Sequence, residues 1–148
     1  MKYSHKVVDK LNQLLVRNID ILNTYRNVIV QTENEKLKTF FVRRFDVQKR
    51  FVNTIKKEIF KHGQIPKNRN RFFSYITSNY FKIKYLLLLK NEKKIAKSFI
   101  DVEELNLQSC ESVIAEKELP SQIKSVLISQ RNKLQESLQY EKKIFELV

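Results

Sequence analysis

The chain has 148 residues, 42% of them hydrophobic and 30% charged, with a formal net charge of +13. This size and composition fit one soluble domain with a single core, so we expect one domain over residues 1–148. A single Gly and two Pro disfavour sheets built on tight turns and favour long helices. One Cys excludes an internal disulfide. No apolar run approaches the ~20 residues of a membrane span, and no apolar signal segment is visible, which together predict a cytoplasmic protein.

The first two helices are predicted to form an antiparallel hairpin. Apolar residues spaced three and four apart predict a helix over about 5–30, and a second seam beside the first indicates burial on two sides. Thr32 followed by Glu35 has the pattern of a capping box, which predicts a second helix over about 33–62. The very short connection between these two ranges makes the helices neighbours.

The second half of the chain is predicted to form another hairpin, reached through a helical crossover. Gly63 and Pro66 end the second helix, and a less regular apolar pattern predicts a helix over about 71–90. Asn91 can cap a helix over about 92–118, and Pro120 separates it from a last helix over about 121–147. Two hairpins joined by one long crossover predict an all-α fold, a ferritin-like four-helix bundle.

The chain resembles an uncharacterised bacterial family of ferritin-like four-helix bundles, a domain of unknown function. The resemblance covers nearly the whole chain and depends on the order and spacing of several short motifs. These are Leu11–Leu15, Asp20 and Tyr25, then Leu37, Phe41, Phe51 and Ile59, then Gly63–Pro66, Glu103–Glu104, Leu119–Pro120 and Gln130. Membership of such a family implies the bundle fold and leaves the biochemical activity open.

One apolar face of the helix predicted over about 92–118 contains a carboxylate. Glu103 falls between Ile100 and Leu107 at the spacing of a single helix face, and the other members of that face are apolar or small. A charge on a buried face is costly unless it is paired, hydrogen-bonded or bound to a metal. Glu103 therefore either has a specific partner or does not face the core.

Polar residues interrupt the other seams as well. The predicted buried polar layer consists of Asn18, Gln48, Glu103 and Gln130. Counted from the helix ends, Asn18 and Gln48 lie near the height of Glu103, and Gln130 lies somewhat away from it. We expect Arg44 or Tyr25 to be the partner of Glu103. The simplest role of such a layer is to fix the register of the helices.

A metal or small-ligand site built on Glu103 with Asn18 and Gln48 is the alternative. Ferritin-like proteins often hold two metal ions with carboxylates and a Glu-x-x-His on two helices. This chain departs from that pattern, because His5 and His62 fall at predicted helix ends and no Glu has a His three residues later. Leu138 also stands where the resemblance would lead us to expect a His. We predict no bound metal and no cofactor.

Positive charge is concentrated in one part of the sequence. Residues 43–84 hold twelve Lys or Arg and only two acids. On the second helix the predicted basic patch consists of Arg43, Lys49, Arg50, Lys56 and Lys57, with members recurring every seven residues. Such a patch suits nucleic acid or an anionic surface. A solvated face in a Lys-rich chain is the simpler interpretation, because the neighbouring phenylalanines have the spacing of core residues.

No pattern typical of an enzyme is present. There is no Gly-rich loop and no Cys–His or Ser-based nucleophile arrangement, and Cys110 has the position of a buried thiol. The sequence predicts a non-enzymatic protein with a structural or protein-interaction role, acting through self-association or a protein partner. Metal or ligand binding in a ferritin-like core is the first alternative. Binding of nucleic acid or an anionic surface by the basic patch is the second.

Overall fold

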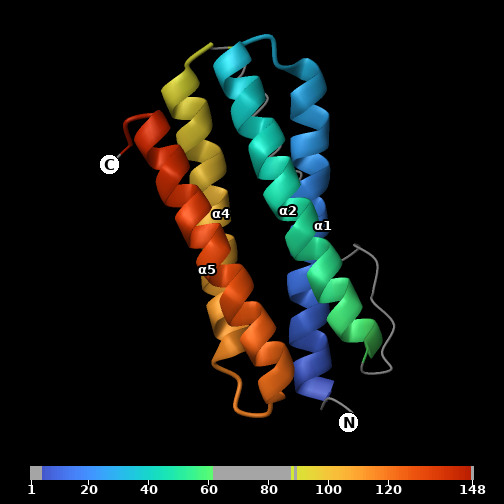
Figure 1. The fold of residues 1–148 in the computed structure, drawn as a ribbon. Helices are drawn as coiled ribbons and strands as arrows, with labels where there is room; N and C mark the ends of the chain where they lie inside the picture. The colour runs from blue at the N-terminus through green and yellow to red at the C-terminus, as the bar shows by residue number, and fades with distance from the viewer. Residues whose placement is uncertain (1–4, 62–87, 89, 148) are drawn as a thin grey trace.

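The computed structural model describes residues 5–61, 88 and 90–147. These residues form four long α-helices and no β-strand (Figure 1). The helices are α1 (His5–Gln31), α2 (Glu35–Lys61), α4 (Glu92–Ile114) and α5 (Ser121–Ile144). The predicted all-α four-helix bundle is thereby confirmed. The predicted crossover helix at about 71–90 and the turn at Gly63 lie outside the described residues, apart from 88 and 90.

The first turns of two helices are fixed by asparagine side chains. Asn91 caps α4 as predicted, because its side-chain oxygen accepts a hydrogen bond from the Lys94 backbone N–H at 3.0 Å. The capping box predicted for α2 is wrong. Its cap is Asn34, whose Oδ1 accepts from the Leu37 N–H at 3.0 Å, while the Thr32 hydroxyl turns back and donates to the Val28 carbonyl at 2.6 Å.

Two helices end earlier than predicted because the chain folds back into other contacts. After Ile114, Glu116 pairs with Lys10 of α1 at 2.9 Å, and Leu119 is buried in the core. After Ile144, Glu146 adopts a positive φ of 55°, and the Leu147 N–H bonds to the Lys142 carbonyl at 2.8 Å. This positive φ with its hydrogen bond is a common C-terminal capping arrangement of an α-helix.

The four helices pack as two hairpins. In Figure 1, α1 lies beside α2 and α4 lies beside α5, and packing contacts also join α1 to α4 and α2 to α5. Asn34, just before α2, donates to Glu92 at the start of α4 at 2.9 Å, so these two helices begin at the same end of the bundle. They therefore run parallel, and Lys61 and Glu92 lie at opposite ends of a bundle about 40 Å long.

The core consists of two apolar clusters, one toward each end of the bundle. One cluster gathers Leu11, Ile55 and Leu127 with their neighbours. The other is richer in aromatic rings, among them Phe40 and Phe99. Between the two clusters lies a group of buried polar side chains, and these form the candidate site.

Candidate functional site

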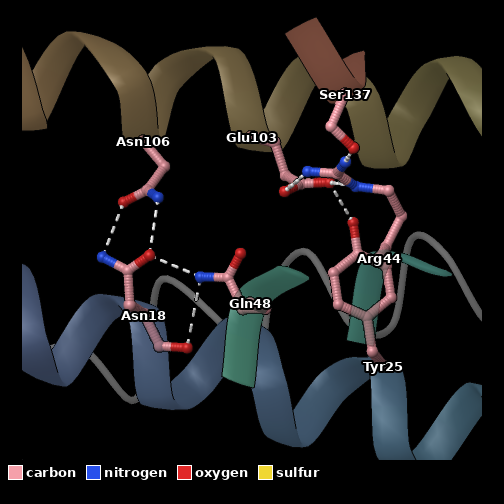
Figure 2. Close-up of polar contacts among 7 residues, drawn as sticks. All are labelled: Asn18, Tyr25, Arg44, Gln48, Glu103, Asn106 and Ser137. Carbon is pink, nitrogen blue, oxygen red and sulfur yellow. Dashed lines mark hydrogen bonds and ion pairs between the residues drawn. The ribbon is translucent and has the colours of Figure 1, made fainter. Parts of the chain in front are cut away.

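An ion pair lies at the centre of the bundle. The Arg44 side chain is fully buried and that of Glu103 is 3% exposed. Arg44 Nε donates to Glu103 Oε2 at 2.6 Å, and the Arg44 terminal nitrogen donates to Oε1 (Figure 2). This is the two-point pairing of a guanidinium with a carboxylate, the strongest geometry available to these two groups. The partner predicted for Glu103 is thus present.

The other two helices each add a hydroxyl to this pair. The Tyr25 hydroxyl of α1 donates to Glu103 Oε2, and the second terminal nitrogen of Arg44 donates to the Ser137 hydroxyl of α5 (Figure 2). Each of the four described helices therefore contributes one side chain, and every named contact joins two different helices. We call Tyr25, Arg44, Glu103 and Ser137 the ionic cluster. The sequence pattern named Tyr25 as a candidate partner but gave no reason to select Ser137.

Three amide side chains form a second group beside the ionic cluster. Asn18 and Asn106 exchange two hydrogen bonds, at 2.7 and 3.2 Å, and Gln48 Nε2 donates to Asn18 Oδ1 (Figure 2). Asn18 Nδ2 also donates to the Leu14 carbonyl of its own helix at 2.7 Å. All three side chains are essentially inaccessible to solvent. We call Asn18, Gln48 and Asn106 the amide cluster.

The electrostatics of the ionic cluster fix the protonation states of Tyr25 and Arg44. Burial raises the pKa of the Tyr25 hydroxyl well above its ordinary value, and the Glu103 carboxylate raises it further. Burial by itself would lower the pKa of the Arg44 guanidinium, but the attraction and hydrogen bonds of Glu103 outweigh it, so that pKa lies above the ordinary value. Tyr25 therefore stays a neutral donor and Arg44 a cation at physiological pH.

The structure places the four residues of the predicted polar layer in different surroundings. Asn18 and Gln48 meet in the amide cluster, and Glu103 lies in the ionic cluster next to it. Gln130 is only half-buried, and none of the hydrogen bonds among the described residues joins it to either cluster. Asn106 was missed, although it follows Glu103 by three residues and so lies on the same helix face.

The ionic cluster does not fit a metal ion. Both oxygens of Glu103 accept hydrogen bonds from Arg44, whose fixed positive charge occupies the place that a cation would take. The amide cluster adds no charge. Among the described residues no group of three or more His, Cys, Asp or Glu is placed to hold a metal ion. Cys110 is buried at the core, and burial raises the pKa of its thiol to about 12, so it is not an activated ligand.

The predicted basic patch is exposed for most of its length. Lys49, Arg50, Lys56 and Lys57 are exposed, and no ion pair among the described residues involves them. Arg43 differs, because its guanidinium pairs with the buried Glu141 of α5 at 2.7 and 3.0 Å. Arg43 therefore belongs to the packing between α2 and α5.

The described helices and the buried clusters define an all-α four-helix bundle with a polar layer drawn from every helix. Residues 6–116, about three quarters of the chain, match the family described as Domain of unknown function (DUF2383). The chain belongs to this family. The matched part includes the whole amide cluster and the ionic cluster except Ser137. No match was found among curated proteins. None of the helices in the described ranges has the length and apolarity needed to cross a membrane.

Proposed function

We propose that this protein is a non-enzymatic helical bundle with a structural or protein-interaction role. The observation that carries the proposal is that the charged groups of the ionic cluster pair with each other. Glu103, the one carboxylate of the ionic cluster, is held at both oxygens by Arg44, and Tyr25 and Ser137 complete the cluster. Such a set supports four helices in one register, and it offers no general base, because its carboxylate is permanently paired.

We further propose that the bundle is ferritin-like. The parallel course of α2 and α4 favours a single long crossover between two hairpins, the connection found in ferritin-like bundles. Glu103 then stands in the part of the bundle where such proteins hold metal, with the guanidinium of Arg44 as its counter-ion. We also propose that the family is bacterial and that the protein is cytoplasmic, and a free, buried Cys110 fits a reducing compartment.

Metal content and assembly state test the proposal together. Purified protein is incubated with Fe²⁺, Mn²⁺ or Zn²⁺, desalted and analysed for metal per chain, and its sedimentation is followed over a range of concentrations. A matched pair of variants, Glu103→Gln and the double variant Arg44→Met/Glu103→Leu, is treated in the same way. We expect less than a tenth of a metal ion per chain and the same assembly state for all three proteins. One metal per chain in the wild type that disappears in Glu103→Gln would overturn the structural role.

A further inference from the structure

Exposed cations lie close together on α2. Some basic side chains of the described helices are neutralised, as in the pairs Lys10–Glu116, Arg43–Glu141 and Lys97–Asp101. By contrast, Lys49, Arg50, Lys56 and Lys57 lie within nine residues, and none of the ion pairs between described residues involves them. We call these four the α2 basic face. The nearest acids on the helix are Asp46, exposed about one turn earlier, and Glu58, which is buried.

The four cations are arranged in two steps along one side of the helix. Lys49 and Arg50 are followed seven residues later by Lys56 and Lys57, a separation of about 10 Å along the axis. Two turns of helix bring the side chains back to nearly the same direction. The result is a straight, two-residue-wide track of positive charge, which suits an extended polyanion better than a compact anion.

An exposed aromatic ring lies at one end of this track. Phe60 is 64% exposed, and it follows Lys56 by four residues and Lys57 by three, so the three side chains are neighbours on the helix surface. The other phenylalanines of the described helices are buried or half-buried. The pattern of core phenylalanines near these charges did not indicate Phe60, because only rings with core spacing stand out in the sequence.

We propose that the α2 basic face and Phe60 bind single-stranded nucleic acid without sequence preference. Lysine and arginine side chains contact successive phosphates, and an exposed ring supplies a stacking surface for one unpaired base. A base in a duplex is not free to stack on Phe60, so an aromatic beside the charges favours a single strand. This nucleic-acid role goes beyond the structural or protein-interaction role proposed above.

An anionic membrane suits this face less well. Helices that lie on membranes turn a broad apolar surface toward the lipid. The apolar side of α2 is buried in the bundle, with Phe41, Val52 and Ile55 all inaccessible. On the outer side, Asn53 is exposed between the two pairs of cations.

Fluorescence anisotropy with a labelled mixed-sequence 20-nucleotide single strand tests the inference. With four phosphates neutralised, the association constant should fall about 50-fold between 50 and 200 mM KCl. The variant Lys49→Gln/Arg50→Gln/Lys56→Gln/Lys57→Gln should lose most of the binding. The control variant Lys93→Gln/Lys94→Gln/Lys124→Gln/Lys143→Gln removes the same charge from exposed positions elsewhere and should bind within about threefold of wild type. Circular dichroism establishes that both variants fold.

Phe60→Leu separates stacking from charge. We expect it to weaken binding by about fivefold or more with an unchanged salt slope, because a stacked base contributes on the order of 1–3 kcal/mol. A duplex of equal length should bind more weakly than the single strand. Several results would overturn the inference: no binding at 50 mM KCl, equal loss in the control variant, no effect of Phe60→Leu, or tighter binding to phosphatidylserine vesicles. None of these results bears on the metal and sedimentation tests above, so failure of the two proposals can be told apart.

Discussion

The geometry of the ionic cluster predicts how much unfolding free energy is lost when one of its two charges is removed. Replacing Glu103 by Leu leaves the fully buried Arg44 guanidinium with only the neutral hydroxyls of Ser137 and Tyr25 as partners. Replacing Arg44 by Met leaves the Glu103 carboxylate with only the Tyr25 hydroxyl. Removing one partner of a buried ion pair typically costs about 3–5 kcal/mol, and both side chains here are shielded from solvent screening. Each single variant should therefore lose about 3–5 kcal/mol of unfolding free energy.

The double variant Arg44→Met/Glu103→Leu should recover most of that loss. It leaves no buried charge, and its residual cost is chiefly the Tyr25 hydroxyl without an acceptor, about 1–3 kcal/mol. The coupling free energy between the two substitutions should then be about 3 kcal/mol or more. Urea unfolding followed by circular dichroism at pH 7 measures all four corners of the cycle, and an unchanged m-value shows that the midpoints report stability.

The result that refutes this reasoning is additivity. If the double variant loses the sum of the two single losses to within about 0.5 kcal/mol, Arg44 and Glu103 do not depend on one another.

Three further predictions concern other parts of the bundle. Burial raises the pKa of the Cys110 thiol to about 12. As the pH rises, the unfolded chain therefore loses this proton before the folded chain does. The contribution of the buried neutral thiol to the unfolding free energy is full below about pH 8.5 and falls by about 1.4 kcal/mol per pH unit above it. Urea midpoints at pH 8, 9 and 10 should show a shallower decline in Cys110→Ala, and equal slopes would contradict the assignment. Asn18→Leu leaves the Gln48 and Asn106 amides without their shared partner and should cost about 2–4 kcal/mol in the same assay, whereas a neutral effect would mean that the amide cluster rearranges freely. Asn91→Ala removes the α4 cap and should cost about 1 kcal/mol in thermal unfolding, and an unchanged midpoint would show that the cap contributes nothing.

The helices could be predicted because their apolar seams are long and regular. The exception at the start of α2 has a local cause. Thr32 and Asn34 both have capping side chains, and sequence spacing does not show that Thr32 donates to the Val28 carbonyl of α1 instead. Competition between such local hydrogen bonds is decided by where the preceding helix ends.

The polar layer was predicted in part, and two of its errors also have physical reasons. A seam position identifies Glu103 as buried, but the burial of Arg44 depends on that partner and cannot be read from α2 alone. Ser137 is small and lies beside the core residue Leu138, so no periodic signal marks it. Gln130 has the seam spacing of α5 but is only half-buried, and the helix periodicity does not explain this difference.

The ionic and amide clusters bear most directly on the axial register of α4 against α1 and α2. The apolar seam of α4 repeats, since Ala96 and Cys110 stand seven residues either side of Glu103 and both are fully buried. Sliding α4 by seven residues would therefore still pack small or apolar groups against α1 and α2. The same slide would remove Glu103 from Arg44 and Asn106 from Asn18, leaving a buried cation and several amides without partners. At about 3–5 kcal/mol for the cation alone, that penalty approaches the whole stability of a small domain. The apolar seam of α4 alone would thus accept more than one register, and we propose that the polar layer selects one of them.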